Sequence, residues 1–334
     1  MKRIITYCFL AVFAIALASC EETQNKKKAS LPDIIGKPGE ILVVLDKSYW
    51  DGELGNTLRD SLTQEFPYLP QVEPMYDLMN VSPRYFEKSF LKYRNLLIFN
   101  IDPERTNAEI AYMKDEWAVP QCLIQINAPS ETSAIELFKE KYGQIAAVIE
   151  QAERTRVISN AEMFEERSLA PVVTEMIGGS PRFPAGYGLK SKKDDFIWIS
   201  YETQYTMQAV LIYKYPIKPG VDMMSPEALI EAQERMTKMN VPGSRDNSHM
   251  MISPVCTPAI TYKKYGTHEF AEIRGLWEVY GDYMGGPFVS HAFYAPDGEN
   301  MILLQSFVYA PKYDKRNYLK QVESILYSFE WKKH

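Results

Sequence analysis

Residues 289–295 (VSHAFYA) and 301–310 (MILLQSFVYA) stand on either side of residues 296–299 (PDGE). Asp and Gly are turn formers, and both flanking runs are rich in residues that favour strands. The pattern predicts an antiparallel hairpin. Two further apolar runs upstream, at 196–199 and 207–215, have the length of neighbouring strands. The second half of the chain is therefore expected to contain a mostly antiparallel sheet.

Two helices are expected to cover that sheet. Ser225 and Pro226 form a helix start, because serine caps an N-terminus and proline fits the first helical position. The residues expected to face inward from this helix are Leu229, Ala232, Met236 and Met239. A final helix is expected to pack through Tyr318, Val322, Ile325 and Phe329. This half is predicted as an α+β domain.

The first half of the chain alternates apolar strand-like runs with helical periodicity. Residues 41–45, 96–99 and 122–126 read as buried strands, and a weaker strand candidate lies near 72–78. A long helix is expected from about Glu131 past Arg154. Shorter helices are expected from the spacing of Leu54, Leu58 and Leu62, and after Ser82-Pro83 with Phe86 and Phe90 buried. The alternation predicts an α/β layer domain.

The N-terminus has the composition of a secretory signal peptide. Lys2 and Arg3 precede an apolar run, and Leu17-Ala18-Ser19 stand directly before Cys20. This run is too short and wrongly flanked for a transmembrane span. A small residue before cysteine is what lipoprotein signal peptidase requires. We therefore expect residues 1–19 to be removed and Cys20 to carry lipid.

Residues 20–36 follow as a polar tether, and the lipid is expected to be the chain's membrane contact. The expected location is the outer membrane, facing either the periplasm or the cell exterior. Loss of residues 1–19 changes the formal charge from −6 to −8, because Lys2 and Arg3 leave with no acid. An acidic chain without a basic aromatic stripe argues against nucleic acid as a partner. The possible partners are an envelope protein or a small ligand.

Four cysteines are present in the whole sequence. Cys8 leaves with the signal peptide and Cys20 is lipidated, so Cys122 and Cys256 remain. They could pair in an oxidising compartment, but both stand in apolar surroundings that favour free buried thiols. This number also excludes a zinc site built from cysteine, and we expect no metal or cofactor.

Sequence motifs of known enzymes are present only as fragments. Residues 268–272 (HEFAE) begin like a zinc protease helix but lack the second histidine. Residues 89–92 (SFLK) match one motif of penicillin-binding proteins without its companions. His291 is expected to be a satisfied core or edge histidine. Catalysis is therefore unsupported, although the sequence does not exclude it.

One strand, at 269–280, combines aromatic and charged side chains on its second face. That face is expected to point outward and leads into a glycine-containing loop. Aromatic groups and arginine are frequent in partner and ligand sites, although an ordinary half-exposed strand has the same pattern. The expected partner-binding residues are Phe270, Arg274, Leu276, Tyr280 and Tyr283.

The chain as a whole resembles an uncharacterised family of envelope lipoproteins from Bacteroidetes-type bacteria. The resemblance rests on four segments: residues 36–44 (GKPGEILVV), 94–98 (RNLLI), 117–121 (WAVPQ) and 184–187 (PAGY). The second half is also similar, in the order of its elements, to the PsbP and Mog1 type of α-β-α sandwich. That likeness implies an adaptor or assembly-factor domain.

The sequence thus predicts a signal peptide (1–19), a lipidated tether (20–36), an α/β domain (37–165) and an α+β domain (166–334). A passage rich in glycine and proline, at 178–188, is expected to mark the junction between the two domains. The expected function is partner or ligand binding without catalysis. The alternatives are a hydrolase acting on cell-wall or glycan substrates and a structural envelope component.

The lipid anchor gives the first prediction. Replacing Cys20 by alanine removes the thiol that carries the diacylglyceryl group, so a radioactive fatty acid fed to the cells should label the wild type and not Cys20→Ala. The matched control is Cys8→Ala, which leaves Cys20 in place and should be labelled normally. Labelling of the Cys20→Ala protein would contradict the anchor.

Overall fold

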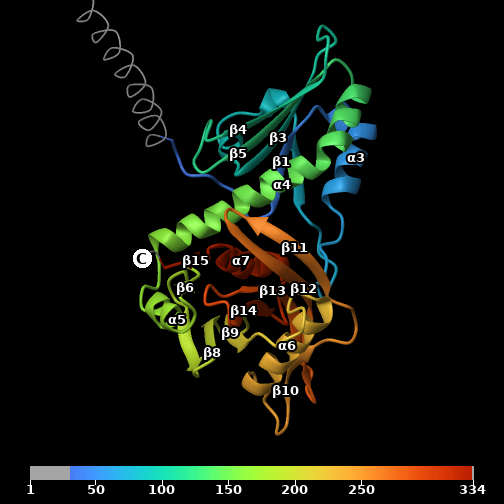
Figure 1. The fold of residues 1–334 in the computed structure, drawn as a ribbon. Helices are drawn as coiled ribbons and strands as arrows, with labels where there is room; N and C mark the ends of the chain where they lie inside the picture. Colours follow the sequence, from blue (N-terminus) through green and yellow to red (C-terminus); the bar gives the residue numbers. More distant parts are fainter. Residues whose placement is uncertain (1–30, 333–334) are drawn as a thin grey trace, which may run out of the picture. The chain divides into compact units, whose positions relative to one another are not determined.

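The computed structural model describes residues 31–332 (Figure 1). The expected signal peptide and Cys20 lie outside the described residues. The chain divides into two compact units. Of the described residues, unit 1 comprises 31–64 together with 76–152, and unit 2 comprises 65–75 together with 153–332. Each unit therefore takes its residues from two separate parts of the chain.

Unit 1 is built on a five-stranded sheet in the order β2-β1-β3-β5-β4. Its strands are β1 (Glu40–Val44), β2 (Asp77–Val81), β3 (Asn95–Ile101), β4 (Glu109–Lys114) and β5 (Cys122–Ala128). Four strands run parallel, and only the edge strand β4 is antiparallel to its neighbour β5. The predicted α/β domain is therefore present. β1, β3 and β5 are buried along most of their length, as continuous apolar runs require.

The helices of unit 1 are α2 (Lys47–Trp50), α3 (Glu53–Leu62) and the first part of α4 (Glu131–Met163). The three leucines of α3 are completely buried, as their spacing predicts. Glu131 at the start of α4 accepts a hydrogen bond from the backbone N–H of Leu54, and the Tyr142 hydroxyl donates one to the carbonyl of Ser61. These bonds hold α3 and α4 side by side.

Three sequence-based expectations for this unit are wrong. Residues 82–92 form only two short 3₁₀ turns, Pro83–Tyr85 and Phe90–Lys92, and Phe86 and Phe90 are half-buried. The strand lies at Asp77–Val81 and not at 72–78. The tether also ends earlier than expected. Asp33 and Ile35 form bridges with Val119 and Tyr93, so the folded part begins before Gly36.

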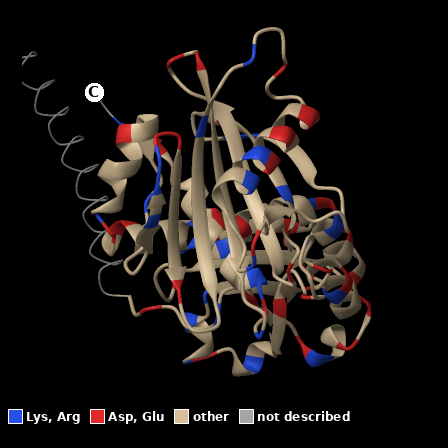
Figure 2. Ribbon diagram, turned by 90° about the horizontal axis from the view of Figure 1, so that it is seen from below, with Lys and Arg blue, Asp and Glu red and all other residues tan. Residues whose placement is uncertain are grey.

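Unit 2 is built on an eight-stranded antiparallel sheet. Seven strands follow the order β10-β12-β13-β14-β9-β8-β7, and β11 pairs with β12 beside β10. The strands are β7 (Gly188–Lys192), β8 (Phe196–Glu202), β9 (Met207–Pro216), β10 (His249–Ile252), β11 (Ala259–Tyr265), β12 (His268–Tyr280), β13 (Gly285–Tyr294) and β14 (Asn300–Tyr309). The predicted hairpin of β13 and β14 lies in the interior of this sheet. β13 and β14 contain no Lys, Arg, Asp or Glu, and such uncharged long strands can be seen in Figure 2.

Helices cover both faces of this sheet. On one face α5 (Leu169–Ile177) and α7 (Arg316–Tyr327) share a core cluster with the strands. On the other face α6 (Pro226–Asn240) does the same. The Ser225 side chain accepts from the N–H of Ala228, which confirms the predicted cap. Met239 is 63% exposed, so its predicted inward position is wrong. A small two-stranded sheet, β6 (Gly179–Ser180) with β15 (Glu330–Trp331), completes the unit.

A segment from the first quarter of the chain belongs to unit 2. Phe66 and Leu69 are buried in the same cluster as α7. The Glu73 carboxylate, 5% exposed, accepts from the backbone N–H groups of Lys315 at 2.6 Å and Arg316 at 2.9 Å. Both N–H groups stand at the start of α7, where the helix itself offers no backbone acceptor and where its dipole favours a negative charge. Glu73 therefore caps α7 across 242 residues of sequence.

The boundary between the units lies within α4, between Ala152 and Glu153. The glycine- and proline-rich passage at 178–188 belongs entirely to unit 2. Compact units defined by contacts are not the same as independently folding fragments. The division into domains at about residue 165 therefore stays a prediction.

Removing the Glu73 cap should destabilise α7 and the site that it covers. In Glu73→Ala two buried N–H groups lose a charged acceptor, and we expect the free energy of unfolding to fall by about 1–3 kcal/mol. Chemical denaturation of the full chain measures this. Glu65→Ala, in the same segment but at an exposed position, is the control and should change stability little. Equal stability of the two variants would contradict the capping role.

Candidate ligand-binding site

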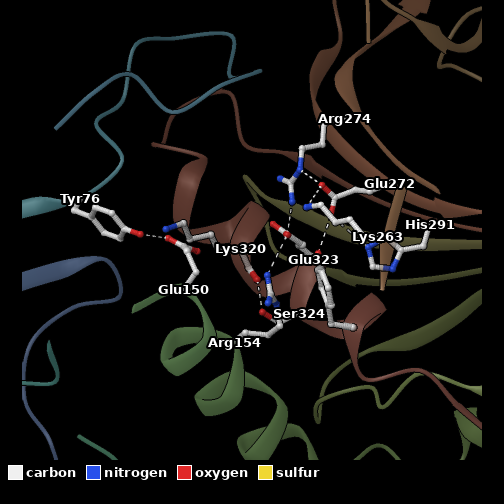
Figure 3. A network of polar contacts seen from close by, with 11 residues as sticks. Tyr76, Glu150, Arg154, Lys263, Glu272, Arg274, His291, Lys320, Glu323 and Ser324 are labelled. Atoms are coloured by element: carbon white, nitrogen blue, oxygen red, sulfur yellow. Dashed lines mark hydrogen bonds and ion pairs between the residues drawn. The ribbon is translucent and has the colours of Figure 1, made fainter. Parts of the chain in front are cut away.

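A buried carboxylate is the centre of a polar network in unit 2. Glu272 on β12 is 1% exposed. It accepts hydrogen bonds from Arg274 Nε at 2.5 Å, Lys263 Nζ at 2.7 Å and the Tyr327 hydroxyl at 2.8 Å. These partners come from β12, β11 and α7. Figure 3 shows Arg274 and Lys263 converging on Glu272.

A second buried carboxylate shares the same arginine. Glu323 on α7 is 6% exposed and accepts a hydrogen bond from the Arg274 guanidinium. Arg154, in the part of α4 that belongs to unit 2, lies 3.7 Å from Glu323 and 3.7 Å from the ring centroid of Tyr327. Arg274 therefore links the sheet to α7, and Arg154 adds a link to α4.

The neighbouring charges in this network shift the pKa values of Glu272 and Tyr327. Burial alone would raise the pKa of the Glu272 carboxyl, but the neighbouring cations Arg274 and Lys263 outweigh burial and hold the pKa well below its usual range. Burial and then the neighbouring Glu272 carboxylate raise the pKa of Tyr327 above its usual value. At neutral pH the network therefore contains ionised Glu272 and a protonated tyrosine hydroxyl that donates to it.

Next to this network is a cavity of about 300 Å³, which we call the histidine pocket. Six of its lining side chains are rings: Tyr265, His268, Phe270, His291, Tyr327 and Phe329. Three charged groups, Glu162, Arg182 and Glu330, also line it and are partly exposed to solvent. The pocket lies wholly within unit 2. Apolar walls with a few polar groups are typical of small-molecule sites.

Both histidines of this pocket have a buried nitrogen without a hydrogen-bond partner. Among the described residues, nothing bonds to Nε2 of His268 or Nε2 of His291. The Glu272 carboxylate lies 3.8 Å from Nε2 of His291, which is too long for a hydrogen bond. His291 is 1% exposed. The prediction of a core histidine is confirmed for its burial and wrong for its satisfied hydrogen bonding.

Both imidazoles are uncharged at neutral pH. Burial lowers the pKa of His268 to about 4, and the nearby His291 lowers it further. Burial also lowers the pKa of His291, although the Glu272 carboxylate opposes that shift. A neutral imidazole offers one donor and one acceptor nitrogen. The pocket can therefore supply hydrogen bonds without supplying a charge from these residues.

The two buried carboxylates do not form a glycosidase pair. In such enzymes one carboxyl group must protonate the leaving group and the other must act as base or nucleophile. Here Glu272 and Glu323 are both engaged with Arg274, and neither lines the histidine pocket. The network instead fixes the wall of the pocket, because Tyr327 belongs to both.

Among residues 31–332 no group of three or more His, Cys, Asp or Glu side chains is arranged to hold a metal ion. Cys122 is buried and Cys256 is half-buried, and both are free thiols. No helix in the described part of the chain is long and apolar enough to cross a membrane.

The expected outward face of β12 is buried at its start. Phe270 is 3% exposed and stacks on His291 with ring centroids 4.0 Å apart. Arg274 is held in the ion network. The prediction that these side chains are exposed is wrong, because α7 covers this face of the sheet. Phe270 instead lines the histidine pocket.

The other expected partner-binding residues lie toward the far end of the strand. Leu276 is half-buried, Tyr280 is 60% exposed and Tyr283 is 97% exposed. Tyr280 stacks on His249, whereas Tyr283 stands in the turn between β12 and β13. None of the three lines the histidine pocket. Their part in binding a partner stays a prediction.

Sequence reasoning did not find Glu323, Tyr327, Arg154 or the pairing of the two histidines. One signal was available for part of the site. Glu323 stands beside the apolar positions of an amphipathic helix, and a carboxylate there indicates a buried partner. Opposite Glu272 in the sheet stands His291, but that register depends on the turn before β13 and cannot be read from the strand alone.

Two families match the chain, one over each half. Residues 166–328 match a domain of unknown function, DUF4837, and residues 35–162 match another, DUF8532. A crystal structure of a protein from Bacteroides thetaiotaomicron is 15% identical, with a TM-score of 0.26. That comparison covers 47% of this chain and 46% of the other, so the chain spans about half the length of its neighbour. A search of curated proteins gives no match. Both family matches are to domains of unknown function, so they assign no role to either half of the chain.

The buried network predicts a large difference between two glutamates of β12. Glu272→Gln keeps the shape of the side chain but leaves Arg274 and Lys263 without its charge. Removing one partner of a buried ion network typically costs about 3–5 kcal/mol, and we expect a loss of this size. The control is Glu269→Gln, an exposed ion-pair partner of Lys264 on the same strand, which should denature like wild type.

Guanidinium denaturation of the three full-length proteins measures the difference. Should Glu272→Gln unfold at the same denaturant concentration as wild type, the carboxylate would have no organising role.

Proposed function

We propose that this chain is a lipid-anchored protein of the outer membrane that binds a small ligand in the histidine pocket and catalyses no reaction. The ligand is held by unit 2. The N-terminal lipid keeps the protein at the envelope, and the described part of the chain carries the binding site.

One observation carries the binding function. Burying a polar atom without a hydrogen bond costs about 1–3 kcal/mol in proteins, and two such nitrogens belong to histidines that line one cavity here. A bound molecule that hydrogen-bonds to them would remove that cost. The cavity size, about 300 Å³, is at the lower end of the range of small-molecule pockets.

We propose no catalysis because the ionisable groups of the site have pKa values far from neutral pH. Catalytic acids and bases need a pKa near the working pH and access to the substrate. The pKa values of Glu272 and Tyr327 are shifted away from neutrality, in opposite directions. His268 is uncharged over the neutral range as well. The likeness of unit 2 to PsbP and Mog1 domains also stays part of this proposal, because those are mostly non-catalytic adaptors.

Lipid attachment is supported by the sequence alone. Residues 17–20 (LASC) form the processing site, and the polar residues after Cys20 suit a tether. Whether the folded part faces the periplasm or the exterior does not affect the binding proposal.

The test is native mass spectrometry of the full chain purified from the envelope of a Bacteroidetes-type host. Thr267 lines the pocket and is exposed in the turn between β11 and β12, so Thr267→Trp should fill the opening without disturbing the core. Wild type should carry an additional small-molecule mass that Thr267→Trp lacks. Thr261→Trp, exposed on β11 and outside the pocket lining, is the matched control and should retain that mass.

Two results would contradict the proposal. One is a wild-type protein without any bound small molecule. The other is equal occupancy in wild type and Thr267→Trp.

A further inference from the structure

The charged groups near the histidine pocket are already engaged with one another. Arg182 lies 3.1 Å from Glu330, 3.5 Å from Glu162 and 3.9 Å from Glu165. Its guanidinium therefore faces three carboxylates. An anionic ligand that approached Arg182 would have to displace them and would meet their negative charge.

A cationic ligand meets a different obstacle. Aromatic rings bind cations through their faces. The guanidinium of Arg154 already lies 3.7 Å from the ring centroid of Tyr327 and 5.7 Å from that of Tyr265. A second cation at these rings would be repelled by Arg154. The buried carboxylates of the adjoining network, Glu272 and Glu323, are engaged by cations of the protein.

Among the described residues that line the pocket, the buried side-chain atoms without a hydrogen-bond partner are two imidazole nitrogens. Nε2 of His268 and Nε2 of His291 are buried and unpartnered among the described residues, and both side chains line the pocket. The proton of a neutral imidazole can sit on either ring nitrogen, so each Nε2 can be a donor or an acceptor. The remaining walls are mostly aromatic or aliphatic carbon. A matching molecule is apolar over most of its surface and carries a group that both donates and accepts.

From this combination, and resting on the proposed function, we propose that the histidine pocket binds an uncharged, largely apolar small molecule with a hydrogen-bonding group such as an amide directed at His268 and His291. The ring walls supply the apolar contact. Hydrogen bonds to the two imidazoles orient the ligand. The carboxylates around Arg182 disfavour an anionic analogue of the same shape, and Arg154 disfavours a cationic one at the Tyr327 ring.

Three molecules of nearly equal shape test this class. Benzamide is neutral, benzoate is an anion and benzamidine is a cation. Calorimetric titration of the full-length protein at pH 7.4, after exchange into ligand-free buffer, compares their affinities. Benzamide should bind with a dissociation constant of about 1 mM, as expected for a fragment of this size, and about tenfold more tightly than either ion.

A variant locates the hydrogen bond. His268→Phe keeps a ring in the aromatic cluster but removes Nε2, and it should weaken benzamide binding about tenfold. Thr267→Trp should abolish binding, and Thr261→Trp should bind as wild type does. The comparison of three probes on wild type needs no variant, so a folding defect in His268→Phe leaves the test intact.

The failures of the two proposals are distinguishable. Tighter binding of benzoate or benzamidine, or equal affinity for all three molecules, would overturn the uncharged class, while the native mass spectrum would still decide whether the pocket binds a ligand. Failure of benzamide to bind wild type would also overturn this inference.

Discussion

Much of unit 2 depends on how a carboxylate is accommodated in its interior. Glu272 is buried at a place where three elements meet, and an isolated charge there would be very unfavourable. Arg274, Lys263 and Tyr327 compensate it from two strands and a helix. Each partner must keep its position for the charge to be tolerated. The network therefore fixes α7 against the sheet, and with it one wall of the histidine pocket.

The same helix is held from its other end by a segment that comes from far away in the chain. Phe66 and Leu69 add apolar contacts to the cluster that contains α7, and Glu73 caps its first turn. The chain thus positions α7 by two independent means, an ion network near its C-terminal half and a cap at its N-terminus. A helix fixed at both ends presents Leu326 and Tyr327 to the pocket in a defined place.

Local patterns predicted most of the elements that build the site. The hairpin of β13 and β14, the final helix and the strands of unit 1 follow from apolar runs and turn residues, because these signals involve neighbours in sequence. The predictions failed where the position or burial of a residue depends on contacts with residues far away in the sequence. Residues 65–75 belong to unit 2 because Phe66 and Leu69 pack in its apolar core cluster. The spacing of apolar residues in the sequence does not reveal that cluster. Phe270 and Arg274 alternate like an exposed face, yet α7 buries them.

The hydrogen bonding of His268 and His291 also depends on residues that are far away in the sequence. The sequence places His268 and His291 on strands, but only the pairing of β12 with β13 brings them to one cavity. Whether a buried imidazole is satisfied depends on distances to groups on other elements. Nε2 of His291 lies 3.8 Å from the Glu272 carboxylate and has no hydrogen-bond partner among the described residues, which makes this core residue a candidate ligand contact.

The central claim is that a ligand completes the hydrogen bonding of these imidazoles. A crystal structure of the chain purified from its own envelope, without refolding or ligand-free exchange, tests it most directly. The account predicts density for a molecule other than water in the histidine pocket, with a polar atom about 3 Å from Nε2 of His268 or His291. Ordered water alone at both nitrogens, or a pocket closed by neighbouring side chains, would contradict it.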